Sequence, residues 1–551
     1  RTLFNRSALD SANNLWKLSR GEFKANIDYS YNRVLANASN TTTYFLDEGN
    51  RIITENRDGT ERDHSLCGKF IYELNQKTAF VNNTLQTNIN WNDIKLSTAG
   101  SIPTAQSADL PDYYVNNSFK MIKKFNGKHL VTFESRNEWE ALPQTLNIGL
   151  NGNTYRQHVG DHAFYTHESA AYAFALKGIA ISLEGGIKGY WRLMDSELSE
   201  LPQQLPGLTE NVVNTNSFTV YAIPKLEYWI RRVNLTVNLP VSYAHYSFDK
   251  AMANRGEVYF SPSLSFNWKP NNRFTGAIRG NIGSSPMNLN LIHPGLVMTD
   301  YRTLKSGVEN FYNLSSQKVS ASFSYKHTRY GLFADGMVMH SWSHQPYTLS
   351  QQLYGDYVVY SYADADNDEK MFLAVGSLGK TLDFMRGSCN ISGSFNRNES
   401  KLLSQQQHVQ SVNSNWNVSG KVNGSPWRWL SLEYAIRYSQ KRLKISNAST
   451  QWLSALTNEL TLDFVPHPKW EWQISGEHYR NELTEGMFKN IAMLDTKLIF
   501  KASKLIELSA SLTNMLNNKQ YNYTTYSQLS SFESQRQLRG RQLLISITLR
   551  K

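Results

Sequence analysis

The chain has 551 residues and a formal net charge of +11, and its mean hydropathy is −0.48 although it contains 25 Phe, 30 Tyr and 13 Trp. Its Lys and Arg residues are scattered rather than gathered into a stripe, which argues against nucleic acid as a partner. No apolar segment approaches the roughly 20 residues that a membrane-spanning helix needs, and two cysteines are too few for a disulfide framework. No linker divides the sequence, so we predict one domain over residues 1–551.

Residues 21–34 predict the first amphipathic strand. The segment GEFKANIDYSYNRV alternates strictly, and its apolar side chains share one parity: Phe23, Ala25, Ile27, Tyr29 and Tyr31. Successive side chains of a strand point to opposite faces of the sheet, so one face is apolar and the other is polar. Such a strand covers either a protein core or lipid, and the rest of the chain decides between these two environments.

Two hairpins in the middle of the chain allow a test of register. In residues 169–186 a two-residue turn at Lys177 and Gly178 pairs the larger apolar side chains of both strands on one face: Leu176 with Ile179, Phe174 with Ile181, and Tyr172 with Leu183. Residues 222–242 repeat the pattern about Arg231 and Arg232, from Ile230 paired with Val233 to Ala222 paired with Val241. Both hairpins therefore predict the same amphipathic sheet.

Further hairpins follow around Pro270, Thr328, Pro466 and Ser503, and long polar segments separate some of them, at 194–215, 283–314 and 343–369. Short turns that alternate with long loops are typical of a barrel threaded through an outer membrane, with the turns in the periplasm and the loops outside. We therefore predict an all-β fold, a transmembrane antiparallel up-and-down β-barrel of about 22 strands in a bacterial outer membrane. The apolar face of residues 21–34 then faces the membrane lipid.

Three segments resemble a known family. NRSALDSANNLWKLSRGEFKANIDYSYNR followed by TTTYFLDEGNRIITEN is similar to the first barrel strands of TonB-dependent outer-membrane receptors, in the branch where a carboxypeptidase-like regulatory domain precedes the plug. PSLSFNWKPNNRFTGAIRG resembles their mid-barrel hairpin, and LTNMLNNKQYNY with RQLRGRQLLISITL resembles their last strands. The resemblance implies a receptor and transporter for a large or scarce ligand, with TonB as its energy-transducing partner.

The chain departs from this family in two respects. It contains no plug or TonB-contacting segment, and it ends in Lys551 where the family often has an aromatic residue. We therefore expect the plug and the signal peptide to be absent from residues 1–551. A passive pore, or a structural subunit of a surface assembly, is the alternative function, and a surface lipoprotein is a further candidate partner.

Candidate ligand-binding residues are aromatic and charged. Loop residues Tyr301, Arg302, Trp342 and His344 are candidates for capturing a ligand, because aromatic and Arg side chains are enriched at binding hot spots. Lumen residues offer a second set of candidates on the path through the barrel: Lys225, Glu227 and Trp229. Rim aromatics of any barrel and ordinary lumen walls have the same composition, so these assignments are hypotheses.

The sequence contains few motifs that indicate catalysis or metal binding. No GxSxG, HExxH, P-loop or CxxC motif occurs, which indicates that the protein is not an enzyme. Asp364, Asp366 and Asp368 stand at the first, third and fifth positions of a calcium-loop pattern. The pattern then breaks, with Glu369 in place of Gly and Val375 in place of the bidentate Glu. A solvated external loop is the preferred interpretation, and we expect no cofactor beyond this weak calcium hypothesis.

Overall fold

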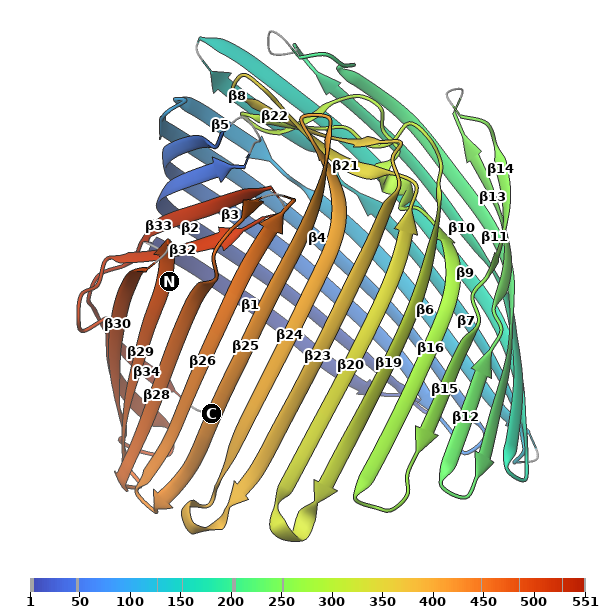
Figure 1. The fold of residues 1–551 in the computed structure, drawn as a ribbon. Coiled ribbons are helices and arrows are strands. Elements are labelled where there is room, and N and C mark those ends of the chain that lie inside the picture. The colour runs from blue at the N-terminus through green and yellow to red at the C-terminus, as the bar shows by residue number, and fades with distance from the viewer. Residues whose placement is uncertain are drawn as a thin grey trace.

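The computed structural model describes residues 4–45, 49–125, 127–150, 152–200, 205–249, 252–446, 448–484, 486–527 and 529–549. These residues form one sheet of 34 strands that curls around a wide lumen, with the strands tilted relative to the barrel axis (Figure 1). Lys551 and part of the predicted loop 194–215 lie outside the described residues. No helix in the described ranges is long and apolar enough to cross a membrane.

The strands of the wall run between a short-turn end and a long-loop end, and consecutive strands pair in antiparallel order. Their bounds are β1 (Phe4–Lys17), β2 (Glu22–Tyr44), β3 (Arg51–Asn75), β4 (Ala79–Gly100), β6 (Asp112–Phe125), β7 (His129–Ala141), β9 (Asn153–Leu176), β10 (Ile179–Leu198), β11 (Glu210–Ile230), β12 (Val233–Asn238), β13 (Val241–Phe248), β14 (Arg255–Phe260), β15 (Ser263–Trp268), β16 (Phe274–Pro286), β19 (Asn313–His327), β20 (Leu332–Gln345), β23 (Asn367–Leu382), β24 (Gly387–Ser404), β25 (Gln407–Trp427), β26 (Leu430–Ile445), β28 (Leu453–His467), β29 (Trp470–Thr484), β30 (Met487–Lys501), β31 (Ile506–Thr513) and β34 (Gln542–Leu549).

Shorter elements lie mainly in the loops. The strands are β5 (Thr104–Asp109), β8 (Gln144–Leu150), β17 (Val297–Asp300), β18 (Thr303–Lys305), β21 (Thr348–Tyr354), β22 (Tyr357–Ala363), β27 (Ala448–Ser449), β32 (Gln520–Tyr526) and β33 (Ser530–Gln537). Three single-turn 3-10 helices complete the fold: η1 (Leu289–Leu291), η2 (Thr328–Tyr330) and η3 (Asp383–Met385). The total of 34 strands therefore includes loop strands, whereas the prediction of about 22 concerned wall strands alone.

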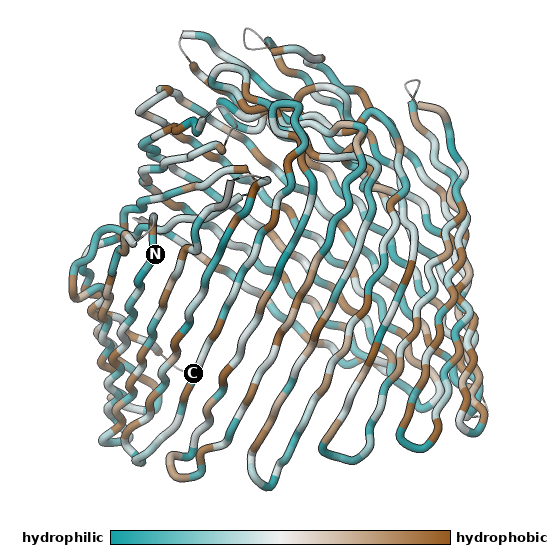
Figure 2. The backbone as a smooth tube through the Cα atoms, viewed as in Figure 1, coloured by the Kyte–Doolittle hydropathy of each residue, from teal (hydrophilic) through white to brown (hydrophobic). Residues whose placement is uncertain are grey.

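The predicted registers of both hairpins are confirmed. Strands β9 and β10 pair Leu176 with Ile179 and continue without a shift to Leu198 opposite Gln157. Strands β11 and β12 pair Ile230 with Val233, and Ala222 pairs with Val241 on β13. Side-chain alternation on both strands fixes the pairing, because a slip by one residue would turn every apolar side chain to the polar face. Hydrophobic and hydrophilic residues accordingly alternate along the wall strands (Figure 2).

The two faces of the wall differ in chemistry. One face carries large exposed apolar side chains, such as Ile181 and Leu226. The other carries cross-strand ion pairs, such as Lys421 Nζ with Glu433 Oε1 at 2.7 Å and Arg437 Nη1 with Glu459 Oε1 at 3.0 Å. Charged side chains are costly against lipid and favourable in a watery lumen, so the apolar face is the outer one.

Two prolines interrupt the wall at neighbouring places. Pro240 separates β12 from β13, and Pro262 separates β14 from β15. Proline has no backbone N–H to give to the ladder, so each strand breaks where it occurs. Regular strand pairing continues on both sides of the two prolines: β12 pairs with β15, and β13 pairs with β14. Strand direction is therefore preserved across the two breaks.

Several loop expectations need correction. The wall strands are longer than a membrane requires: β3 has 25 residues, against the 9 to 11 of a tilted spanning strand. Strands β10 and β11 consequently extend into the predicted loop 194–215. The segments 283–314 and 343–369 contain the short strands β17, β18, β21 and β22. Two of the buried apolar clusters include many residues of these segments, at the long-loop end.

Candidate functional site

Two long loops fold inward at the long-loop end and form what we call the lid, residues 287–312 and 346–366. Strand β18 of the first loop pairs in parallel with β22 of the second, with Thr303 opposite Val358 and Leu304 opposite Val359. Strand β21 pairs in parallel with the end of β24. Parallel pairing requires strands that are distant in the chain, so the lid forms only when both loops meet. Strands β21 and β22 cross the upper end of the barrel (Figure 1).

Apolar burial holds the lid in place. Leu304 is fully buried, and it shares a cluster with Met298 and Tyr301 of the lid. The same cluster includes Ile148 from the short strand β8 and Leu198 from the wall strand β10. Full burial of a side chain of this size stabilises by about 1.5–3 kcal/mol relative to its exposure. The lid is thus packed like a small core rather than laid over the opening as a solvated loop.

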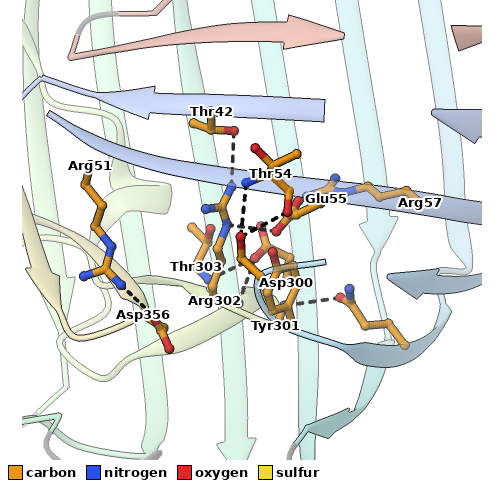
Figure 3. A network of polar contacts seen from close by, with 12 residues as sticks. Thr42, Arg51, Thr54, Glu55, Arg57, Asp300, Tyr301, Arg302, Thr303 and Asp356 are labelled. Atoms are coloured by element: carbon orange, nitrogen blue, oxygen red, sulfur yellow. Dashed lines mark hydrogen bonds and ion pairs between the residues drawn. The ribbon is translucent and has the colours of Figure 1, made fainter. Parts of the chain in front are cut away.

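A set of charged contacts joins the lid to the far wall, and we call it the clasp: Arg51, Glu55, Arg302 and Asp356. Arg302 Nε lies 4.0 Å from Glu55 Oε1, and Arg302 Nη2 donates a hydrogen bond of 3.4 Å to Thr42 Oγ1 (Figure 3). Arg51 forms an ion pair with Asp356 of the second loop. Both loops are therefore tied to the same strand, β3.

Burial makes the Arg302 contact the stronger part of the clasp. The side chains of Glu55 and Arg302 are 2% and 8% exposed, whereas those of Arg51 and Asp356 are largely in solvent. Glu55 is also held by Arg57, whose Nη2 lies 2.8 Å from Glu55 Oε2. The removal of one partner from a buried ion pair leaves a buried charge with fewer partners, which is more destabilising than the loss of an exposed pair.

Backbone groups of the lid also find partners in the wall. The Asp300 carboxylate accepts hydrogen bonds from the backbone N–H groups of Arg302 and Thr303, each at 3.0 Å, and so forms a tight turn (Figure 3). Gln106 Oε1 accepts from the Tyr301 N–H at 3.2 Å, and Gln157 Oε1 accepts from the Met298 N–H at 2.9 Å. Buried backbone groups need such partners, and these wall side chains therefore fix the position of residues 298–303.

A cavity of about 370 Å³ lies between the lid and the wall. It is lined by residues of both lid loops and of the neighbouring part of the wall: Ile102, Leu150, Asn153, Tyr155, Tyr301, Arg302, Tyr354, Gly355, Asp356 and Tyr357. Two polar atoms of these lining residues, the Tyr301 hydroxyl and Arg302 Nη1, are buried and have no hydrogen-bond partner among the described residues. Buried polar groups are normally paired, so these two atoms are unused hydrogen-bond donors within residues that line the cavity.

Burial raises the pKa of three tyrosines in and beside the lid: Tyr357, Tyr360 and Tyr44. Burial raises the pKa of Tyr357 to about 12, and the neighbouring Tyr155 hydroxyl adds to the effect. Burial likewise raises the pKa of Tyr360 to about 12 and, more weakly, that of Tyr44, whose ring lies 5.5 Å from the Arg302 guanidinium. These phenols are therefore neutral hydrogen-bond donors over the physiological range.

The structure brings only two of the predicted ligand-binding residues to this cavity. Tyr301 and Arg302 line it, but they are 1% and 6% exposed. They belong to the packed lid, and their role in capturing a ligand stays a prediction. Sequence reasoning missed Glu55, Gln106 and Gln157, which position them. No local pattern distinguishes these three residues from other polar wall residues, because their role depends on contacts far along the chain.

Trp342 and His344 lie elsewhere. They are part of β20 rather than of a loop, and they share the parity of Val338, which faces outward. They line a separate cavity of about 590 Å³ at the long-loop end of the outer face. His344 Nδ1 contacts Asp368 Oδ1 there at 2.9 Å. The period-two alternation of residues 338–344 was the signal that could have placed them on a strand.

The three lumen candidates lie far from the lid. Lys225, Glu227 and Trp229 occupy the inward parity of β11, next to the turn at Arg231 and Arg232. Lys225 and Glu227 form an ion pair with each other, and 44% of the Trp229 surface is exposed. None of the three lines the lid cavity. Their role as ligand contacts near the short-turn end of the lumen stays a prediction.

The three aspartates of the calcium hypothesis each contact other side chains, and two of them share His344. Asp364 accepts a hydrogen bond from Tyr312, Asp366 lies 3.6 Å from His344 Nε2, and Asp368 is held by both His344 and Lys401. Within the described ranges, no group of three or more His, Cys, Asp or Glu side chains is arranged to hold a metal ion. The arrangement gives the calcium hypothesis no support.

Comparison with known proteins shows what the fold resembles. No protein-family model matches the sequence. No curated protein sequence matches it either. Among solved structures, the chain is similar to the copper transporter OprC, with a TM-score of 0.50 and 9% identity over 97% of this chain and 79% of that one.

Two further neighbours have slightly lower TM-scores. The outer membrane transporter YddB from Escherichia coli gives 0.49 at 10% identity, over 99% of this chain and 75% of that one. The ferric citrate transporter FecA gives 0.48 at 9% identity, over 97% and 78%. At such identities the likeness concerns the fold alone. The chain thus has the β-barrel fold of the copper transporter OprC, which confirms the predicted fold class.

Proposed function

We propose that the protein is the barrel of an outer-membrane receptor that takes up a large or scarce ligand with energy from TonB. The observation that carries this proposal is the lid: two loops cross the mouth, are clasped to the far wall and cover a cavity with unpaired hydrogen-bonding groups. A passive pore has no use for loops that a buried ion pair holds across its mouth. A gated receptor needs such a closure, because the ligand must be held before it passes.

The mechanism that we propose is binding followed by rearrangement, without covalent chemistry. A ligand settles at the lid cavity, where the Tyr301 hydroxyl and the Arg302 guanidinium donate hydrogen bonds to its oxygen atoms. Arg302 also belongs to the clasp, so a ligand that binds Arg302 weakens its hold on Glu55 and favours an open lid. A plug domain that precedes residues 1–551 would then respond to the ligand and contact TonB. A surface lipoprotein remains a candidate partner at the mouth.

The fold likeness suggests the first probes to use. The neighbours include a copper transporter and a ferric citrate transporter, so copper(II) and ferric chelates form a reasonable starting panel. In the native bacterium, we expect deletion of the gene to abolish uptake of one of these probes and a protonophore to do the same in the intact strain. Uptake that persists with the protonophore would favour a passive pore. Unchanged uptake of every probe after deletion would contradict the proposed transport of metal chelates.

Complementation with two variants tests the site itself. Tyr301→Phe keeps the packing of the ring and removes one donor to the ligand, so we expect the half-saturating concentration to rise about fivefold, the equivalent of roughly 1 kcal/mol. Trp342→Phe lies on the outer face and serves as the control, with no expected change. Equal effects of the two variants would contradict the assignment of the lid cavity as the binding site.

A further inference from the structure

The outer face of the wall is not apolar all the way round. One hydrogen-bonded row of the sheet crosses from β9 to β13 and pairs Glu168 with Ile187, Ile187 with Val220, and Val220 with Tyr243. Side chains in one row share a face, so Glu168 points outward together with three exposed apolar residues. In this row, the residue on β9 is therefore a carboxylate, whereas the residues on β10, β11 and β13 are apolar.

Glu168 belongs to a group of outward polar residues, which we call the polar patch: Asn83, Asn117, Ser135, Asn137, Thr166 and Glu168. They come from four adjacent strands, β4, β6, β7 and β9, and the ladder places Asn117 opposite Asn137 and Asn137 opposite Thr166. Their parity is that of Phe133 and Tyr172, which face outward on the same strands. The patch thus extends without interruption over the outer face of these four strands.

The patch lies at the depth of the membrane hydrocarbon. A row of aromatic residues, Trp139 opposite Phe164 and Phe164 opposite Trp191, lies one outward position closer to the long-loop end than Asn137 and Thr166. Such a row marks the girdle at one membrane interface. The patch lies on the other side of this girdle, within about ten residues of the short turns where β7 begins and β9 ends. Lipid would therefore surround it if no protein covered it.

Hydrogen bonds inside the patch satisfy only part of its polar atoms. Glu168 Oε1 accepts from Ser135 Oγ at 2.7 Å and from Asn137 Nδ2 at 3.4 Å, and Asn137 Oδ1 accepts from Thr166 Oγ1 at 2.7 Å. Asn117 Nδ2 donates to Asn83 Oδ1 at 3.2 Å. Among the described residues, Glu168 Oε2, Asn117 Oδ1 and Asn83 Nδ2 have no side-chain hydrogen bond. Each polar group left unpaired in hydrocarbon is costly.

The hydrogen-bonding groups of the patch are complementary to those of the same patch on a second copy of the chain. An amide side chain carries both a donor and an acceptor, so two patches related by a two-fold axis can pair amide with amide. The unpaired atoms include an amide donor and an amide acceptor, which such a contact would join. We propose that two copies of this chain associate in the membrane through the polar patch. The carboxylate of Glu168 is then covered by protein instead of lipid.

Adjacent asparagines on β6 provide a matched test. Asn117 faces outward in the patch, whereas Asn116 faces the lumen, so cysteine at the two positions differs only in the side of the wall. Both variants are made in a chain in which the free cysteines Cys67 and Cys389 are replaced by Ser. On oxidation in native membranes, we expect Asn117→Cys to give a disulfide-linked dimer and Asn116→Cys to stay monomeric.

A second measurement uses no cysteine. The triple variant Asn83→Leu, Asn117→Leu and Asn137→Leu should fold, because it makes the outer face apolar, and its mass in mild detergent should be half that of the wild type by light scattering. Wild-type protein that is monomeric and does not cross-link through Asn117→Cys would overturn the proposal. A cross-link from Asn117→Cys to a protein of another mass would also overturn it, since the partner would then be a different protein.

Discussion

The wall and the lid of this protein are held by different kinds of contact. In the wall, each strand pairs with its neighbour in the chain, and regular alternation fixes the register over as many as 23 consecutive pairs between β2 and β3. In the lid, residues far apart in the sequence meet, as when Arg302 contacts Glu55 and Thr303 pairs with Val358. The difference teaches that the wall is a product of local patterning, whereas the lid depends on a few long-range contacts that a ligand can compete for.

The largest effect is expected from breaking the clasp. Arg302→Met keeps an unbranched side chain for packing but removes the buried ion pair with Glu55, which then retains its contact with Arg57. Because Glu55 keeps that one cation, we expect a loss near the lower end of the range for breaking a buried pair, about 3 kcal/mol. We expect the lid to open while the wall stays folded. Higher steady conductance in a planar bilayer and faster trypsin cleavage after Lys305 would show this.

The control for this variant is Arg329→Met, since Arg329 belongs to η2 at the opposite end of the barrel. It should leave conductance and cleavage unchanged. If Arg302→Met behaved like this control, the apolar clusters alone would hold the lid, and the clasp would have no gating role.

A smaller effect is expected in the wall, where close packing between neighbouring strands can be tested directly. A methyl group added at Gly186 would lie 2.4 Å from the backbone oxygen of Glu168 and 2.8 Å from the Tyr221 hydroxyl, whereas one at Gly185 would meet only the Tyr221 backbone oxygen at 3.7 Å. Gly186→Ala should therefore destabilise the barrel by about 1–3 kcal/mol.

Gly185→Ala is the neighbouring control and should be close to neutral. Urea unfolding in lipid vesicles, followed by the gel mobility of the folded barrel, measures both variants. Equal unfolding midpoints would mean that the strands can shift apart at little cost, and the wall would then be less rigid than its register suggests.

The smallest effect concerns an exposed charge cluster at the long-loop end of the wall. Hydrogen bonds from His344 and Lys401 lower the pKa of Asp368 below its usual value. A lowered pKa stabilises the folded state above the unfolded pKa of about 3.9, and this contribution is lost as the pH falls through the folded value. Asp368→Asn should therefore lower the unfolding midpoint slightly at pH 7.

The same comparison at low pH checks the cause. Below the lowered pKa of Asp368, wild type and Asp368→Asn should unfold at the same urea concentration. A difference that persisted in acid would mean that the variant acts through packing, and not through the charge of Asp368.

Sequence reasoning reached some parts of the candidate site and not others. It selected Tyr301 and Arg302 for their chemistry, and both line the lid cavity. It could not give their burial, which depends on Ile148, Leu198 and other residues that no local pattern links to residue 301. It also placed Trp342 and His344 in a loop, although they continue the alternation of β20.

The sequence by itself determined the wall: its strand character, its hairpin registers and the face that each side chain takes. The physical reason is that a strand has a period of two residues and that a short turn fixes the pairing of its flanking strands. Only the tertiary structure decided how the loops 287–312 and 346–366 fold over the mouth and which distant wall residues they contact. Those features arise from contacts between distant segments, and such contacts leave no periodic trace in the chain.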